Sequence, residues 1–429
     1  MRRVAITGLG AVTPLGTDAP ATWTGLAAGR SGVGPLTSFD AGTFDVRIAG
    51  QVRDFTPPAD VPGKHLSRAG SFAVAAAQEA LRDAGPGVTD GDPYARGVAL
   101  GGTVGRPELQ ELVDMSHRLA ASGGTDIPRQ SPRDVLRRNQ NVALSWVARV
   151  AAASGPLVSV STACAGSAHA VGEAYRRIQE GDATVMLAGG FDALTTWLDV
   201  LGFALLGALT TGHNDEPAAA CRPFDATRSG FVLGEGAVVL VLEEWDTAVA
   251  RGADIKAELI GYGSTLNAYR ITDSPPDGGG AISAMREALA DAGLAPADID
   301  YVAAHGTGTP GNDASETAAV KAVFGPDAHR LSISSPKSMT GHLTSAAGGV
   351  NLIAAIGALR EQLVPPTVNL YHPDPALDLD YTPHEARRRE VRAVLVNAFA
   401  FGGTNACLVL CRGPGASERQ HGEQTAAAR

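Results

Sequence analysis

Cys164 is the residue of this chain best placed to act as a nucleophile. It lies in Val-Ser-Val-Ser-Thr-Ala-Cys-Ala-Gly-Ser (158–167), where a short apolar strand turns into a stretch with apolar residues at helical spacing. A helix N-terminus offers unpaired N–H groups and the positive end of the helix dipole, so we expect the pKa of this thiol to be lowered. The resulting thiolate would be a ready nucleophile. The alternative is an inert core residue, the commoner role of a lone cysteine.

Two histidines and a lysine follow other apolar strands. His305 precedes a glycine-rich loop in Val-Ala-Ala-His-Gly-Thr-Gly-Thr-Pro-Gly-Asn-Asp (302–313). Lys337 and His342 lie in Ser-Ser-Pro-Lys-Ser-Met-Thr-Gly-His, just before a long apolar helix. Because ligand sites of α/β sheets form where strands end, we expect these side chains and the cysteine to converge. Without such a site, each histidine is more often a hydrogen-bonding residue at a strand end, and the lysine a solvated loop residue.

Alternating strands and helices are predicted to position these side chains. Apolar runs of strand length recur along the chain between stretches of helical spacing, which indicates a layered α/β fold. The predicted strands are Val4–Thr7, Gly97–Leu100, Leu157–Val160, Thr184–Ala188, Gly236–Leu242, Lys256–Tyr262, Tyr301–Ala304, Leu331–Ser334, Arg392–Asn397 and Ala406–Cys411. Three of them end just before the segments that carry the cysteine and the histidines.

At 429 residues the chain exceeds one ordinary hydrophobic core, so a two-lobed architecture is expected. We place the division between residues 1–250, which carry the cysteine, and residues 251–412, which carry the histidines. Each half opens with a strand that carries a Gly-x-Gly turn, Gly8-Leu9-Gly10 and Gly261-Tyr262-Gly263, a hint of duplication that is inconclusive by itself. Residues 413–429 have no apolar period and are predicted to be a disordered tail.

Composition and charge argue against several classes of protein. With 44% hydrophobic residues the chain is not generally disordered, and a net charge of −10 without a sustained basic cluster argues against nucleic-acid binding. No apolar stretch is long enough to cross a bilayer, and early glycines interrupt the run after Arg2-Arg3, so we expect neither membrane insertion nor export but a cytoplasmic protein. No CxxC spacing occurs among the cysteines, so no structural zinc is expected; they are Cys164, Cys221, Cys407 and Cys411.

Further segments carry a resemblance that covers nearly the whole chain. Besides the cysteine and histidine segments, they are Arg2-Arg3-Val4-Ala5-Ile6-Thr7-Gly8-Leu9-Gly10, Arg222-Pro223-Phe224-Asp225, Gly230-Phe231-Val232-Leu233-Gly234-Glu235-Gly236 and Asn397-Ala398-Phe399-Ala400-Phe401-Gly402-Gly403-Thr404-Asn405. In this order they resemble the β-ketoacyl synthases, in particular the ketosynthase II type that includes the ketosynthases of type II polyketide synthases. Any one segment is weak evidence, whereas all of them in the family's order argue strongly against chance.

The resemblance implies a fold and a reaction. Condensing enzymes resemble thiolases, whose two related halves form five αβαβα layers. Cys164 would hold an acyl chain as a thioester while a malonyl group on an acyl carrier protein loses carbon dioxide and becomes the carbon nucleophile. His305 and His342, as neutral imidazoles, would hydrogen-bond the malonyl thioester oxygen and stabilise the enolate. The substrates are carried on the phosphopantetheine arm of the carrier protein, so no bound cofactor or metal is implied.

The resemblance also implies supporting roles near the histidines. Lys337 matches a lysine that supports the site through its charge and hydrogen bonds. Glu316 matches an acidic residue that orients the histidine and lysine network, and with Asp313 it also fits the pattern of a capping box at a helix start. Both roles could coexist.

Two further matches concern the substrate. Phe401 matches a phenylalanine that gates the acyl pocket and whose backbone N–H completes an oxyanion hole with that of Cys164; a core-packed aromatic is the alternative. Ala400 replaces a glycine common in relatives, so we expect a stiffer loop. Thr307 and Thr309 match hydroxyls that bind the phosphopantetheine arm, although threonines in turns often only cap backbone groups.

Several segments depart from the family pattern in ways that concern the substrate rather than the reaction. They are Tyr269-Arg270-Ile271-Thr272, Gly105-Arg106-Pro107, Leu343-Thr344-Ser345 and the region 126–148, which includes Arg137-Arg138-Asn139-Gln140-Asn141. In relatives this last region lies near the dimer interface and the acyl tunnel. The departures favour a specialised polyketide or polyene pathway and do not exclude fatty acid elongation.

The expected partners are an acidic acyl carrier protein and a second subunit, either an identical one or a related ketosynthase-like chain. An acidic enzyme needs a local basic patch to receive an acidic carrier protein, and the candidates are Lys64, Arg68, Arg137 and Arg138. Two functions remain as alternatives to condensation. One is a non-catalytic subunit of the chain-length-factor kind, which normally lacks the cysteine. The other is an acyltransferase that does not decarboxylate, against which the histidine pair argues.

Overall fold

The computed structural model describes residues 1–59, 66–103, 105–126 and 132–413, so the predicted tail lies outside it apart from Gly413. Within these residues the main sheet has ten strands, and each predicted strand corresponds to one of them with bounds that differ by a few residues at most ends. They are β1 (Val4–Val12), β4 (Arg96–Gly102), β5 (Leu157–Val160), β6 (Val185–Ala193), β7 (Glu235–Glu244), β8 (Ala257–Leu266), β9 (Tyr301–Ala303), β10 (Ser332–Ser334), β13 (Ala393–Phe399) and β14 (Thr404–Cys411).

The strand order shows that the chain is built from two matching halves. The order across the sheet is β10-β9-β13-β14-β8-β1-β7-β6-β4-β5. On each side the outer three strands are parallel, β5-β4-β6 and β10-β9-β13, and the next two are antiparallel to their neighbours. The halves meet where β1 pairs antiparallel with β8. The predicted duplication is therefore confirmed.

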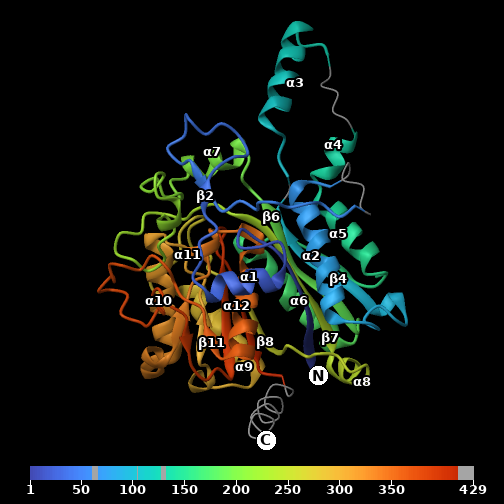
Figure 1. The fold of residues 1–429 in the computed structure, drawn as a ribbon, viewed down its shortest axis with the longest axis vertical. Helices are drawn as coiled ribbons and strands as arrows, with labels where there is room; N and C mark the ends of the chain where they lie inside the picture. The colour runs from blue at the N-terminus through green and yellow to red at the C-terminus, as the bar shows by residue number, and fades with distance from the viewer. Residues whose placement is uncertain (60–65, 104, 127–131, 414–429) are drawn as a thin grey trace, which may run out of the picture.

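Helices form three layers that enclose the two halves of the sheet (Figure 1). One outer layer has α2 (Arg68–Ala84) and α5 (Gln140–Val150), the central layer has α6 (Gly166–Glu180) and α12 (Ala347–Glu361), and the second outer layer has α9 (Gly279–Ala292) and α10 (Pro310–Phe324). The outer layers pack on separate cores around Phe72 and Met285, whereas the central layer shares one core with strands of both halves. This is the expected five-layered αβαβα fold.

The two Gly-x-Gly segments lie inside β1 and β8, not in turns as predicted. A Cβ atom at Gly10 would lie 1.9 Å from the carbonyl oxygen of Ala76 in α2. A Cβ atom at Gly263 would lie 2.1 Å from the carbonyl oxygen of Ala284 in α9. These glycines therefore let one helix approach each central strand closely, at equivalent places in the two halves.

We expect Gly10→Ala to lower the free energy of unfolding by about 3 kcal/mol, because the backbone of α2 must move to admit the methyl group. Chemical denaturation of both proteins measures the difference. Gly212→Ala is the matched control, since a Cβ atom there would meet nothing within 4 Å. Equal stabilities of the two variants would contradict the close approach of α2.

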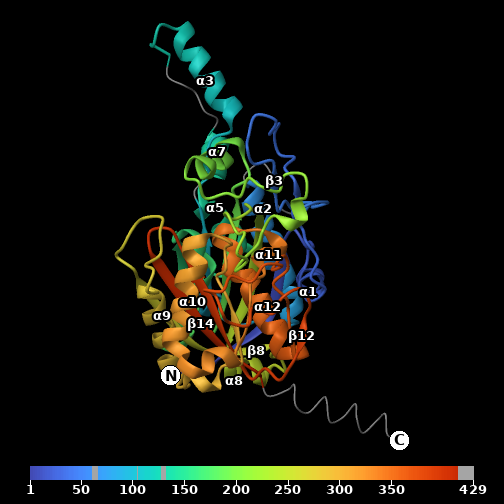
Figure 2. The ribbon, with the colours of Figure 1, turned by 90° about the vertical axis from the view of Figure 1, so that its left-hand side faces the viewer.

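The remaining elements lie around the layers. They are α1 (Ala19–Ala27), α3 (Leu109–Ala121), α4 (Pro132–Arg137), α7 (Trp197–Leu205), α8 (Trp245–Ala250), α11 (Lys337–Thr340) and two small ladders, β2 (Gly34–Pro35) with β3 (Ile48–Ala49) and β11 (Leu363–Val364) with β12 (Arg387–Arg388). In both views α3 projects from the body at the end opposite the N-terminus (Figures 1 and 2), and none of its residues is buried. Among the described residues no helix has the length and hydropathy to span a membrane.

Candidate active site

Cys164 lies in a 3-10 turn, Ala163–Ala165, between β5 and α6. Ala163 has φ 45°, in the left-handed region that a residue with a Cβ atom adopts at an energetic cost. This strained residue turns the chain sharply from the strand towards the helix, which starts two residues after the cysteine at Gly166. The Cys164 side chain is 7% exposed and lines a cleft of about 220 Å³.

His305 and His342 line the same cleft, so the structure brings together residues from both halves of the chain. Their ring centroids are 5.6 Å apart and the ring planes are nearly perpendicular. His305 follows β9, whereas His342 follows α11 and is fixed by backbone hydrogen bonds. Its N–H donates to the Val232 carbonyl at 2.7 Å, and its own carbonyl accepts from the Gly234 N–H at 2.9 Å.

The protonation state of the two histidines follows from their surroundings. The backbone N–H of Thr344 donates to Nδ1 of His342 at 3.2 Å, so the ring proton of the neutral form lies on Nε2. Burial and the Lys337 charge hold the pKa of both histidines well below the usual value. Both imidazoles are therefore neutral at pH 7, in agreement with the expectation of neutral N–H donors.

Lys337 is buried at the start of α11, and its Nζ has no hydrogen-bond partner among the described residues. Burial lowers its pKa to about 8, while the negative charges of Glu316 and of a Cys164 thiolate act in the opposite direction. Glu316 accepts hydrogen bonds from the backbone N–H groups of His305 and Gly306, both at 2.8 Å. It therefore fixes the loop that carries His305.

Asp313 and Glu316 do not form a capping box, which corrects that part of the prediction. Helix α10 begins at Pro310, so Asp313 already lies in its first turn. Asp313 instead accepts hydrogen bonds from the backbone N–H groups of Thr307 at 3.1 Å and Gly308 at 3.2 Å. Both carboxylates thus hold the glycine-rich loop that follows β9.

The end of β13 and the turn that follows it also line the cleft. Phe401 lines the cleft, and the backbone N–H groups of Phe401 and Cys164 act on the cysteine sulfur in the direction that lowers the pKa of its thiol. The left-handed residues of this turn are Gly402 and Gly403, so Ala400 causes no backbone strain in this conformation. Thr307 and Thr309 also line the cleft, with their hydroxyl oxygens 2.8 Å apart.

The pKa of the Cys164 thiol is not lowered, contrary to the sequence-based expectation. Burial raises this pKa to about 11, and the Lys337 ammonium and the backbone N–H groups of Phe401 and Cys164 only partly oppose the effect. The turn buries the sulfur inside the protein. There the loss of hydration destabilises a thiolate more than the nearby N–H groups stabilise it. The thiol therefore carries its proton at pH 7 in the substrate-free protein.

We expect Lys337→Met to slow alkylation of Cys164 by iodoacetamide at pH 7 by about fivefold, because the ammonium group lowers the pKa of the thiol. The difference should shrink above pH 8, where the lysine of the unmodified protein loses its proton. Intact-mass measurement of the alkylated fraction over time gives the rates. Lys321→Met, which removes a surface lysine paired with Asp378, is the control. Equal or faster alkylation of the Lys337 variant would contradict this electrostatic role.

Two asparagines that support the site were not singled out from the sequence. Asn397 donates to Glu316 at 3.0 Å, and Asn351 donates to the Ala304 carbonyl beside His305 at 2.9 Å. Both are fully buried, Asn397 in β13 and Asn351 in α12. The available signal was a lone amide inside an apolar strand or helix, because such groups are buried only with hydrogen-bond partners.

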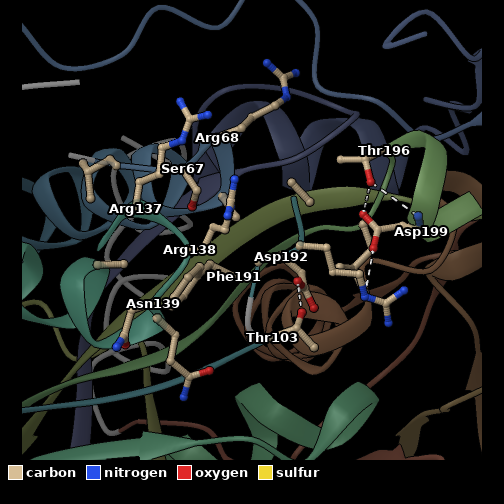
Figure 3. A pocket seen from close by; sticks show the side chains of 18 of the residues that line it. Ser67, Arg68, Thr103, Arg137, Arg138, Asn139, Phe191, Asp192, Thr196 and Asp199 are labelled. Atoms are coloured by element: carbon tan, nitrogen blue, oxygen red, sulfur yellow. Dashed lines mark hydrogen bonds and ion pairs between the residues drawn. The ribbon is translucent and has the colours of Figure 1, made fainter. Parts of the chain in front are cut away.

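A second cavity of about 300 Å³ lies beside the ends of β4 and β6 (Figure 3). Its lining includes Arg106, which belongs to a segment that departs from the family pattern. The lining also includes three arginines that were predicted to receive the carrier protein. Each is paired with a carboxylate: Arg68 with Glu235, Arg106 with Asp199, and Arg137 and Arg138 with Glu111. These ion pairs offset much of the charge of the four arginines, and the basic patch for a carrier protein stays a prediction. Lys64 lies outside the described residues.

The segment around Arg270 borders the first cleft. Thr272, Asp273 and Ser274 line that cleft, and the Ile271 carbonyl accepts a hydrogen bond from the Gly402 N–H at 2.7 Å. Arg270 itself is exposed and pairs with Asp273 at 3.3 Å. This departing segment therefore contacts the turn that carries Phe401.

Comparison with known proteins agrees with the geometry of the cleft. Residues 1–248 match the family described as Beta-ketoacyl synthase, N-terminal domain, and residues 256–371 match Beta-ketoacyl synthase, C-terminal domain. The chain belongs to the β-ketoacyl synthase family. Two relatives, both named 3-oxoacyl-[acyl-carrier-protein] synthase 2, come from Coxiella burnetii and Synechocystis sp. This β-ketoacyl synthase is 43% identical to the first over 96% of its own length and 99% of the relative's, and 43% identical to the second over 95% and 97%.

Solved structures of ketosynthases share the fold of this β-ketoacyl synthase. One is a type II PKS acyl-carrier protein in complex with its ketosynthase bound to the hexaketide, with 34% identity and a TM-score of 0.87. Another is the ishigamide ketosynthase/chain length factor, with 37% identity and a TM-score of 0.87. Each comparison covers 96% of this chain and 99% of the other.

Proposed function

We propose that this protein condenses an acyl chain held on Cys164 with malonyl-acyl carrier protein and releases a 3-oxoacyl-acyl carrier protein and carbon dioxide. The observation that carries the proposal is one cleft shared by the buried thiol and two neutral histidines. The relatives named 3-oxoacyl-[acyl-carrier-protein] synthase 2, which match along nearly their whole length, support it.

In the loading step, the Cys164 sulfur attacks the carbonyl carbon of an acyl thioester. The bond from that carbon to the carrier's sulfur breaks, and the cysteine proton ends on the carrier's thiol. The backbone N–H groups of Cys164 and Phe401, both of which lower the pKa of the thiol, are proposed to donate to the developing oxyanion. Thr307 and Thr309 are proposed to hydrogen-bond the phosphopantetheine arm.

In the second step, the bond between the malonyl carboxylate and its neighbouring carbon breaks and carbon dioxide leaves. The electron pair forms an enolate whose oxygen accepts hydrogen bonds from His305 and from the Nε2–H of His342. The enolate carbon then attacks the Cys164 thioester, and the carbon–sulfur bond breaks. The negative charge passes to the cysteine sulfur, where the Lys337 ammonium stabilises it until a solvent proton restores the thiol. Glu316 supports this network by holding the His305 loop.

The pathway and the subunit partner are also proposals. The segments that depart from the family pattern and border the two cavities favour elongation of polyketide or polyene chains over ordinary fatty acids. We propose a dimer with an identical or related chain, because β5 is an edge strand of the main sheet, and Leu157 in β5 and Val135 and Leu136 in α4 are about half exposed. Light scattering after size-exclusion chromatography, alone and with a related subunit, gives the mass. The division into residues 1–250 and 251–412 remains a prediction.

The deciding experiment mixes the protein with a series of acyl carrier proteins and follows its intact mass. A covalent acyl adduct, followed after addition of malonyl carrier protein by carbon dioxide and a ketoacyl product two carbons longer, supports condensation. An adduct without decarboxylation would favour the acyltransferase alternative. No adduct with any donor would favour a non-catalytic partner subunit or an enzyme that needs its second subunit.

A further inference from the structure

Asp192, at the end of β6, is a buried carboxylate beside the active site that the reaction steps above do not use. It is 2% exposed, and one face of the residue lines the second cavity, where the Thr103 hydroxyl donates to Oδ1 (Figure 3). Its other oxygen, Oδ2, accepts from the Thr344 hydroxyl at 2.5 Å and from the Ser345 N–H at 3.1 Å. Burial raises the pKa of Asp192, and these hydrogen bonds oppose the effect. The carboxylate thus holds Thr344 and Ser345, which lie two and three residues after His342.

Thr344 occupies a strained position between this carboxylate and His342. Its φ is 47°, and for a β-branched residue the left-handed region is a real outlier. Thr344 donates one hydrogen bond from its hydroxyl to Asp192 and another from its backbone N–H to Nδ1 of His342. A backbone conformation that costs energy persists only where its surroundings hold it, and the bond to Asp192 is the side-chain contact that does so here.

We propose that Asp192 and the Thr344 hydroxyl are positioning residues for the condensation reaction. Through the left-handed conformation of Thr344, they aim its N–H at Nδ1 of His342 and thereby keep the ring proton on Nε2. Without that hydroxyl bond, the 344 backbone relaxes, the N–H leaves Nδ1, and the imidazole samples the tautomer that lacks the donor towards the cleft. The inference rests on the proposed role of His342. Thr344 belongs to one of the segments that depart from the family pattern.

The test uses Thr344→Val, which keeps the β-branch and the volume but removes the hydroxyl. In a Cys164→Gln background, we expect carbon dioxide release from malonyl carrier protein to fall about tenfold, less than the 10²–10³-fold cost of deleting an oxyanion donor. Acyl loading, measured by intact mass with Cys164 present, should change by less than about twofold. Thr344→Ser should restore decarboxylation. Thr22→Val, which removes an equally buried hydroxyl in α1, is the matched control.

The tautomer is read directly from the ¹⁵N shifts of histidine-labelled protein, with the His342 signals assigned by their loss in His342→Ala. We expect a bare Nδ1 and a protonated Nε2 in the unmodified protein, and averaged shifts in Thr344→Val. An unchanged rate, an unchanged tautomer, an equal loss of loading, or failure of serine to rescue would each overturn the proposal. If the Cys164→Gln protein with Thr344 intact releases no carbon dioxide and the unmodified protein gives no ketoacyl product, the proposed function itself has failed.

Discussion

The Cys164→Ala protein is expected to accept no acyl group from any carrier protein, a loss of at least about 10³-fold in the rate of loading. Among the described residues that line the cleft, Cys164 is the only cysteine, so no second thiol there can take the acyl group. Intact-mass measurement after mixing with acyl carrier protein detects the adduct. Cys411→Ala, which removes a thiol from β14 that does not line the cleft, should load normally.

A second substitution at Cys164 tests whether the decarboxylation step remains active when the nucleophile is missing. Cys164→Gln should also block loading, yet it should leave malonyl decarboxylation active, because the histidines remain and the amide fills the position of the thioester. Radiolabelled acyl transfer to the Cys164→Ala protein would refute the nucleophile assignment. Loss of decarboxylation in the glutamine variant would instead mean that the cysteine is needed for both steps.

Removal of either histidine should reduce malonyl decarboxylation by about 10²–10³-fold, the usual cost of one lost donor to a developing oxyanion. His305→Ala and His342→Ala are measured in the Cys164→Gln background by carbon dioxide release. With Cys164 present, acyl loading of the same variants should fall by less than about tenfold, because that step uses the backbone N–H groups. His329→Ala, on a turn away from the cleft, is the control. Equal losses in both steps would contradict the proposal that the histidines act in decarboxylation and not in acyl loading.

The pH dependence gives an independent check on the histidines. Burial and Lys337 hold the pKa of both well below the usual value, so the neutral form persists as the pH falls through the range where an exposed histidine takes up a proton. Decarboxylation by the Cys164→Gln protein should therefore stay constant between about pH 7.5 and 6.5 and decline only at lower pH. A decline centred on pH 6.5 would mean that an ordinary histidine limits the reaction.

Much of the fold could be predicted from local patterns. The ten strands were located because buried strands appear as short apolar runs bounded by turn residues, and this pattern is local. The two glycine pairs correctly indicated duplication, yet they were assigned to turns. Their actual reason, a helix backbone about 2 Å from each missing Cβ atom, involves residues far along the chain.

For the candidate site, too, local sequence predicted some features, whereas others depend on residues far apart in the chain. Cys164, His305 and His342 were identified from their types and from their place after strands, and the shared cleft brings them together. The predicted low pKa of the thiol was wrong, because local sequence indicates a helix start but not how deeply a turn buries the sulfur. The arginines chosen for carrier binding are paired with acidic residues such as Glu111 and Glu235, which are distant in sequence.

The sequence by itself determined the family, the alternation of elements and the residue types available for chemistry. The family, the order of elements and the residue types can all be read from short segments of the sequence and their order along the chain. Only the tertiary structure decided the protonation states and the supporting contacts. Glu316 reaches the His305 loop, and Asp192 reaches Thr344 across 152 positions of the chain. Burial and charge act through space, so they depend on which strands and helices meet, and that is decided when the two halves pack around their common core.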